Sequence, residues 1–197
     1  MCSYDGVSAI VLAGGSSIRM GKTNKLLTNM NGSPMASHVV KIASSSSAKE
    51  TIVVTGYQSE LVRNALSQYS VKFIYNPDYK MGLSTSIKSG INAVSKKTAG
   101  ALILLSDMPR VTRKTINSLI GHFEDRKGSI ICRPIYKGIE GNPVLWPRGF
   151  FYKLINLSGD MGARHLIKNY NEKVSLVEVK DAGINIDFNR PSDFENS

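Results

Sequence analysis

Short apolar runs alternate along the chain with longer segments in which apolar residues recur every three or four positions. Runs of the first kind are typical of buried strands, and segments of the second kind are typical of amphipathic helices. The pattern predicts helices at residues 34–44, 60–69, 84–94, 112–123 and 163–170. It predicts strands at residues 7–13, 51–55, 72–75, 101–105, 129–132, 142–146 and 174–179.

The order of these elements predicts the fold class. Strands and helices alternate without an internal repeat or a long linker, which favours an α/β fold with a mainly parallel, twisted sheet between two helical layers. Residues 101–105 are apolar throughout, as expected of a central parallel strand. A chain of 197 residues normally folds around one core, so we expect residues 1–197 to form a single three-layer αβα Rossmann-like domain.

The net charge of +10 raises the question of a nucleic-acid partner. The lysines are scattered, however, and no run of basic residues is interleaved with aromatic residues as in single-strand binders. We therefore expect no nucleic-acid partner, although a non-catalytic basic binding module stays an alternative. A positive surface also attracts small anions such as a triphosphate.

The apolar runs and the cysteines indicate the compartment. No apolar run approaches the length of a membrane-spanning helix, and residues 1–5 lack the basic flank and apolar core of a signal peptide. Cys2 and Cys132 are far apart and lack metal-ligand spacing, which suits a reducing compartment. We expect a cytoplasmic protein with no membrane partner.

A glycine-rich, basic loop follows the first predicted strand. Because glycine lacks Cβ, backbone N–H groups in such a loop can approach an anion closely, and nearby cations add to the attraction. A strand followed by such a loop is typical of phosphate binding, so a nucleotide is the first candidate ligand. The residues concerned are Gly14, Gly15, Ser16, Ser17, Arg19, Gly21, Lys22 and Lys25.

A P-loop NTPase or kinase is the alternative interpretation of this loop. Residues 16–23 have Ser16 where the Walker A motif requires glycine. A Walker loop also opens a long helix, whereas residues 31–34 (Asn-Gly-Ser-Pro) predict a turn soon after the loop. The alternative rests on Gly21-Lys22-Thr23 and on a buried strand that ends before Asp107.

Asp107 directly follows the apolar strand 101–105 and Ser106. Ligands of open α/β sheets bind beyond the carboxyl ends of the strands, where Asp107 is expected to lie. Mg²⁺ is commonly held by one or two carboxylates together with phosphate oxygens, and Asp187 is the candidate for the second carboxylate. A turn or helix-cap role for Asp107 and an exposed position for Asp187 are the structural alternatives.

Six short motifs occur in order along the chain: residues 12–21 with Lys25, Asn76-Pro77 with residues 81–86, Asp107-Met108-Pro109, residues 141–144, residues 159–164, and Ile186-Asp187. With these motifs the chain resembles the molybdopterin nucleotidyltransferase family over nearly its whole length. The resemblance implies the nucleotide-diphospho-sugar transferase type of αβα fold and a Mg²⁺-dependent enzyme that transfers a nucleotidyl group to a phosphate and releases pyrophosphate.

The resemblance also implies roles for individual residues. Lys25, Arg19 and Asp107 are expected to be catalytic, and Asp107 and Asp187 are expected to bind the metal. The acceptor is expected to contact Asn142, Asp160 and Arg164. Nucleotide binding is expected of Leu12, Ala13, Gly14, Gly15, Ser16, Ser17, Lys25, Asn76, Gly82, Ser84 and Ser86.

The expected substrates are CTP and a molybdopterin-type acceptor. Residues 82–86 and 159–164 resemble the cytidylyl members, whereas Gly15 resembles the guanylyl members, so GTP stays open. Asn142 stands where the family usually has His, and residues 187–193 are longer than the matching family segment. A sugar or alcohol phosphate therefore stays open as the acceptor, and transient contact with a molybdoenzyme or its chaperone is expected.

Overall fold

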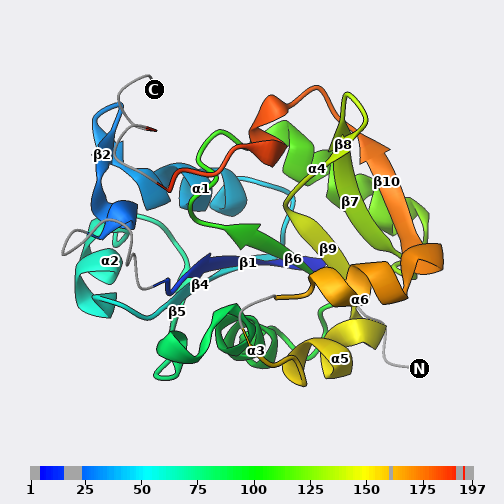
Figure 1. Ribbon diagram of the computed structural model, residues 1–197, viewed down its shortest axis with the longest axis horizontal. Helices are drawn as coiled ribbons and strands as arrows, with labels where there is room; N and C mark the ends of the chain where they lie inside the picture. The colour runs from blue at the N-terminus through cyan, green and yellow to red at the C-terminus, as the bar shows by residue number, and fades with distance from the viewer. Residues whose placement is uncertain (1–4, 16–23, 160–161, 190–192, 194–197) are drawn as a thin grey trace.

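The computed structural model describes residues 5–15, 24–159, 162–189 and 193 (Figure 1). Its centre is an eight-stranded sheet of order β10-β7-β9-β6-β1-β4-β5, in which β8 pairs with β7. A separate hairpin consists of β2 (Asn29–Met30) and β3 (Ser33–Pro34). The strands of the large sheet are β1 (Val7–Ala13), β4 (Glu50–Thr55), β5 (Lys72–Tyr75), β6 (Gly100–Leu105), β7 (Ile131–Tyr136), β8 (Ile139–Glu140), β9 (Val144–Pro147) and β10 (Val174–Glu178).

Helices cover both faces of this sheet. In Figure 1, α1 and α4 lie above the strands, and α3, α5 and α6 lie below them. This arrangement confirms the expected αβα fold class. The helices are α1 (Met35–Ser44), α2 (Ser59–Ala65), α3 (Leu83–Ala93), α4 (Arg113–Asp125), α5 (Phe151–Ile155) and α6 (Arg164–Asn169).

The alternation of side chains along β1 divides the core into two layers. Val11 and its odd-numbered neighbours pack with α1 and α4, whereas Ile10 and Leu12 pack with α3. Successive side chains of a strand point to opposite faces, so a strand buried on both faces is mostly apolar. All seven residues of β1 are buried, and the hydroxyl of its one polar residue, Ser8, is hydrogen-bonded to Glu50 and Thr98, both at 2.6 Å.

The sheet is mainly parallel, as expected, but β8 and β9 run in the opposite direction. β1 pairs in parallel with β4 and β6, and β10 pairs in parallel with β7. β9 runs antiparallel to both β6 and β7. The reversal begins at a tight turn between β7 and β8, where Lys137 and Gly138 have φ of 50° and 77°, values that suit a two-residue hairpin.

Several element bounds differ from the sequence-based predictions. The strand expected at 129–132 is β7 at Ile131–Tyr136, and the helix expected at 60–69 ends at Ala65. The pattern missed the short helix α5, the β2–β3 hairpin and β8, because elements of two to five residues are too short to establish a period. Within the described part of the chain, no helix is both long enough and apolar enough to cross a membrane.

Two helical glycines give a matched test of the packing between helix and sheet. A Cβ on Gly90 of α3 would lie 2.5 Å from Cγ2 of Ile10 in β1, whereas a Cβ on Gly121 of α4 would meet nothing within 4 Å. We expect Gly90→Ala to lower the free energy of unfolding by about 1–3 kcal/mol, because the core there has no room for a methyl group. Gly121→Ala should raise it by roughly 0.5–1 kcal/mol through helix propensity alone.

Urea denaturation of both variants and the wild-type protein measures these changes. Equal stabilisation by the two substitutions would show that α3 does not pack tightly against β1.

Candidate active site

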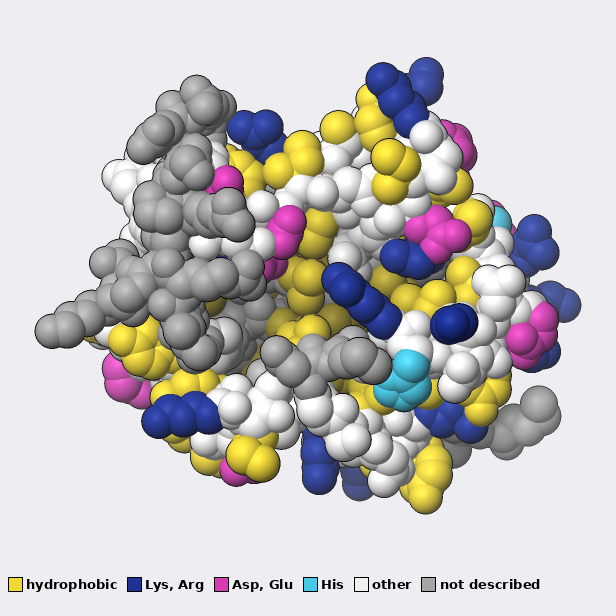
Figure 2. Space-filling view, viewed as in Figure 1, with side chains coloured by type: hydrophobic (Ala, Val, Ile, Leu, Met, Phe, Trp, Pro, Cys, Tyr) yellow, Lys and Arg dark blue, Asp and Glu magenta, His cyan; other side chains and the backbone are white. Residues whose placement is uncertain are grey.

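A cavity of about 390 Å³ opens at the carboxyl ends of β1 and β6, beside the first turn of α3. Figure 2 shows a hollow near the middle of the molecular face, with hydrophobic side chains on its floor and acidic side chains beside it. Unpredicted residues also line the cavity, among them Ser106 and the segment 79–81. The predicted site residues that line it are Leu12, Gly14, Gly15, Lys25, Gly82, Ser86 and Asp107.

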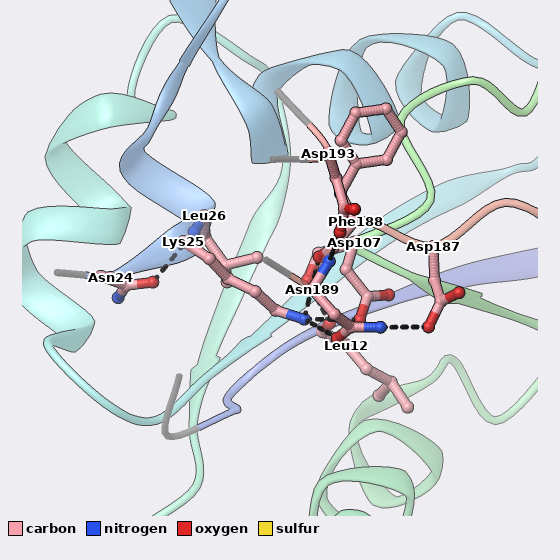
Figure 3. Close-up of polar contacts among 10 residues, drawn as sticks. Leu12, Asn24, Lys25, Leu26, Asp107, Asp187, Phe188, Asn189 and Asp193 are labelled. Atoms are coloured by element: carbon pink, nitrogen blue, oxygen red, sulfur yellow. Dashed lines mark hydrogen bonds and ion pairs between the residues drawn. The ribbon is translucent and has the colours of Figure 1, made fainter. Parts of the chain in front are cut away.

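The Lys25 ammonium group joins three segments of the chain (Figure 3). Its Nζ lies 2.8 Å from Oδ2 of Asp107 and donates to Oδ1 of Asn189 at 2.9 Å and to the carbonyl of Phe188 at 3.3 Å. The Lys25 and Asp107 side chains are only 14% and 22% exposed. Partial burial strengthens the attraction relative to a surface ion pair, because less water screens it.

Local hydrogen bonds fix the backbone that carries Lys25. Lys25 begins the short 3₁₀ helix η2 (Lys25–Leu27), and the buried Asn24 caps it by accepting from the N–H of Leu26 at 3.1 Å. The Asn24 amide also donates to the carbonyl of Tyr57 at 3.3 Å. Leu26 is buried in the core beneath. The lysine therefore extends into the cavity from an anchored turn.

The segment 187–189 is attached directly to Asp107. The N–H of Phe188 donates to the Asp107 carbonyl at 2.8 Å, and the Phe188 ring is buried. The Asn189 amide donates to Oδ2 of Asp187, so Asn189 contacts both Lys25 and Asp187. The structure thus brings Lys25 and Asp107 together in the cavity and links Asp187 to Lys25 through Asn189. Asp187 itself is exposed and is not part of the cavity lining. Sequence analysis missed Asn189; its only signal was an amide two residues after Asp187.

The two carboxylates suit Mg²⁺ in its usual protein setting. Among the described residues no group of three or more His, Cys, Asp and Glu side chains could hold a metal. Mg²⁺ is often bound by one or two carboxylates plus phosphate oxygens and water, and Oδ1 of Asp107 has no hydrogen-bond partner among the described residues. Lys25 repels a cation at this position, so the residues fit a metal that arrives together with a polyphosphate.

The opposite wall of the cavity depends on two glycines. A Cβ on Gly14 would lie 3.0 Å from Oγ of Ser86, so glycine lets the loop after β1 pass close to α3. Gly82 caps α3 with φ of 107°, a conformation that favours glycine. A Cβ on Gly15 would meet nothing within 4 Å. The N-terminal end of the α3 dipole gives this wall a positive potential that favours an anion, while the N–H groups of Ser84 and Thr85 themselves donate to the carbonyls of Gly159 and Gly82.

Three residues expected to bind nucleotide do not line the cavity: Ala13, Asn76 and Ser84, all buried. The Asn76 amide donates to Oγ1 of Thr85 at 2.9 Å and to Oγ of Ser86 at 3.0 Å. Asn76 is therefore placed to orient Ser86, and direct contact of these three residues with a nucleotide stays a prediction. Ser16, Ser17, Arg19 and Asp160 lie outside the described residues.

The two described residues expected to bind the acceptor also lie outside the cavity lining. Asn142 immediately precedes the Pro143 that leads into β9, and the antiparallel pairing of Val144 with Ile103 places it at the same sheet edge as Asp107. Arg164 is exposed at the start of α6. The turn before it packs on the cavity wall, since a Cβ on Gly162 would lie 2.9 Å from Cδ2 of Leu83.

Comparison with known proteins gives a consistent result. The family described as MobA-like NTP transferase domain matches residues 9–174. The molybdenum cofactor cytidylyltransferase of Escherichia coli K12 is 29% identical over 192 residues, covering 95% of this chain and 93% of the relative. The crystal structure of a homologue of Mycobacterium tuberculosis rv0371c, from Mycobacterium sp. strain JC1, aligns with a TM-score of 0.86 and 28% identity, covering 96% and 93% of the two chains.

A more distant structure shares the fold. The CMP:2-keto-3-deoxy-manno-octonic acid synthetase complexed with CTP aligns with a TM-score of 0.78 at 13% identity, covering 98% of this chain and 96% of that chain.

The position of Lys25 makes a test of the metal site possible. We expect Lys25→Met to bind Mn²⁺ about tenfold more tightly than the wild type in the absence of nucleotide, because the variant lacks the positive charge that lies 2.8 Å from Asp107. Electron paramagnetic resonance of free Mn²⁺ measures the affinity. Lys88→Met removes an exposed lysine of α3 and is the matched control. Equal affinities in all three proteins would argue against a metal at Asp107.

Proposed function

Because the chain belongs to the family of MobA-like NTP transferase domains and is therefore a nucleotidyltransferase, we propose that it transfers CMP from CTP to the terminal phosphate of a molybdopterin-type acceptor, with Mg²⁺ as cofactor. The family match agrees with the resemblance drawn from the six motifs. The observation that carries the proposal is the cavity in which Lys25 and Asp107 face the glycine loop after β1.

The proposed reaction is an in-line displacement at phosphorus. An oxygen of the acceptor phosphate attacks the α-phosphorus of CTP and forms a new P–O bond. The bond from the α-phosphorus to the bridging oxygen breaks, and pyrophosphate leaves with the electron pair. The acceptor phosphate is already ionised, so the reaction requires no general base. Catalysis then consists mainly of positioning the reactants and neutralising their charge.

Residues in the cavity and the neighbouring Asp187 fit these two tasks. Lys25 can exchange its contacts with Asp107 and Asn189 for the triphosphate, to which it presents three N–H donors. The backbone of Gly14 and Gly15 provides N–H groups for phosphate oxygens, and the N-terminal end of the α3 dipole adds a positive potential. Asp107 and Asp187 would hold Mg²⁺, which supplies charge neutralisation when bound. Arg19, Ser16 and Ser17 are assigned to phosphate binding by the motif alone.

We propose CTP over GTP for two reasons: the name of a similar protein and the resemblance of residues 82–86 and 159–164 to the cytidylyl members of the family. The relative that is 29% identical is named a cytidylyltransferase. A Cβ on Gly15 would meet nothing within 4 Å, so the described structure gives no steric reason at this residue to prefer one base. GTP remains the second candidate.

The proposed acceptor site lies at the same edge of the sheet as Asp107, beside β9. Asn142, Asp160 and Arg164 are proposed to bind the acceptor, because Asn142 lies at the edge that carries Asp107 and the turn before Arg164 packs against Leu83. Arg164 suits a phosphate, which guanidinium binds through two parallel hydrogen bonds. A sugar or alcohol phosphate is the alternative acceptor, and a molybdoenzyme or its chaperone is the proposed protein contact.

The structure disfavours the P-loop interpretation. After the glycine-rich loop the described chain forms a three-residue 3₁₀ helix and then the β2–β3 hairpin. A Walker A loop requires a long helix at this point, whose N-terminus holds the phosphates.

Pyrophosphate release tests the proposed reaction. We expect the protein with Mg²⁺ and a molybdopterin acceptor to release pyrophosphate from CTP at least tenfold faster than from GTP, ATP or UTP. A coupled pyrophosphatase assay measures the rate, and omission of the acceptor is the control. Preference for GTP would make the protein a guanylyltransferase, and release of inorganic phosphate without pyrophosphate would reject nucleotidyl transfer.

Asp107→Asn tests the catalytic role of the carboxylate. We expect turnover to fall at least 100-fold while the fold persists, because the amide is a poor Mg²⁺ ligand and cannot form the ion pair with Lys25. Asp125→Asn alters an exposed carboxylate at the end of α4 and is the control. Circular dichroism verifies folding. Turnover of Asp107→Asn within threefold of the wild type would exclude Asp107 from the reaction.

A further inference from the structure

The buried Asp181 lies at the start of the segment that leads to Asp187. It caps the 3₁₀ helix η6 (Ala182–Asn185), where its Oδ1 accepts from the N–H of Gly183 at 2.9 Å. Its Oδ2 accepts from the N–H and Oγ1 of Thr112, both at 2.9 Å, and from Oγ1 of Thr115 at 2.5 Å. Asp181 therefore joins η6 to the first turn of α4.

A carboxylate is required for this set of contacts. Both oxygens of Asp181 accept from backbone N–H groups, which an amide could do at only one of its two polar atoms. The side chain has no ion pair among the described residues and is only 6% exposed. An unpaired buried charge is costly unless hydrogen bonds compensate it, so the four bonds to Asp181 explain how it is tolerated.

The two chain segments joined by Asp181 meet again at the active site. Residues 107–112 connect β6 with α4, and residues 181–189 pass alongside them in the opposite direction. The two segments are joined at one end by the hydrogen bonds between Asp181 and Thr112. At the other end the Phe188 N–H donates to the Asp107 carbonyl. Between these points the segments pack closely, since a Cβ on Gly183 would lie 2.3 Å from the Arg110 carbonyl oxygen.

We propose that Asp181 is a positioning residue of the active site. By fixing η6 to the N-terminus of α4, it sets the register of residues 187–189 against Asp107. This register brings the Asn189 amide oxygen within 2.9 Å of Lys25 Nζ and places Asp187 beside Asn189. Asp181 itself does not line the cavity. The expected effect of Asp181 on turnover rests on the proposed nucleotidyl transfer. Its expected effect on the register of residues 187–189 is independent of that proposal.

Asp181→Asn changes one oxygen to an N–H₂ group and disrupts one of the two backbone links at constant side-chain size. Glu50→Gln, at the amino-terminal edge of the sheet, is the control for loss of charge without loss of a backbone link, because the Glu50 contacts within the described chain are all on Oε1 and the glutamine oxygen can keep them. Glu50 Oε1 likewise accepts from a backbone N–H, that of Ser95 at 2.7 Å, and from a hydroxyl, that of Ser8 at 2.6 Å. Thr115→Val, which removes one hydroxyl donor to Asp181, is the milder variant if Asp181→Asn does not fold.

Two quantities are measured for each of these proteins. The first is the hydrogen-exchange rate of the Phe188 amide, with the amides of β1 and β6 as an internal reference for global stability. The second is the pair of kinetic constants for CTP, kcat and KM, each determined separately. We expect Asp181→Asn to accelerate Phe188 exchange at least tenfold and to lower kcat at least tenfold, with KM changed less than threefold. Thr115→Val should shift both in the same direction by about threefold. Glu50→Gln should leave both unchanged after correction for global stability.

Unchanged Phe188 exchange in Asp181→Asn, equal acceleration in Glu50→Gln, or faster exchange with wild-type kcat would each overturn the proposal. A wild-type protein that releases no pyrophosphate from any nucleoside triphosphate would reject the proposed function, and Phe188 exchange would still decide the register.

Discussion

The ion pair between Lys25 and Asp107 holds the candidate active site together. It joins the turn after the glycine-rich loop to the loop that follows β6, and through Phe188 and Asn189 it includes the C-terminal part of the chain. In the absence of a ligand, each charge compensates the other at a position where water is partly excluded. The cavity can therefore hold the two charged groups that the proposed reaction assigns to a polyphosphate and its metal, without leaving either group uncompensated.

The parallel sheet explains why these groups converge. β1 and β6 are neighbours in register, with Leu12 opposite Leu105, so the loops that follow them begin at the same edge. The hydroxyl and the N–H of Ser106 both donate to the Leu12 carbonyl, at 2.6 and 3.3 Å, and fasten these loops to each other. The loops after β1 and β6 therefore form one compact site, although the two strands are more than eighty residues apart along the chain.

The sequence predicted those parts of the site that depend on local pattern. Asp107 and Lys25 stood out because one follows an apolar strand and the other follows a glycine-rich loop, and the mainly parallel αβα fold followed from strand and helix alternation. Asn189 and Asp181 could not be found in this way, because their partners Lys25 and Thr112 are distant along the chain. The reversal of β9 was missed as well, since an apolar strand carries no mark of its direction.

That reversal has a consequence for how such a protein can diversify. Parallel strands offer this edge of the sheet only the loops that follow them, but β9 offers the loop that precedes it, which contains Asn142. This loop is fastened to the segment that leads to residues 187–189, because the N–H of Asn142 donates to the Ile184 carbonyl at 2.9 Å. If Asn142 binds the acceptor as proposed, an exchange of the loop between β8 and β9 is a route to enzymes with new acceptors. The new loop must keep the close packing of Gly141 on Ile184, where a Cβ would lie 2.4 Å from the carbonyl oxygen, so that residues 187–189 keep their place at Lys25.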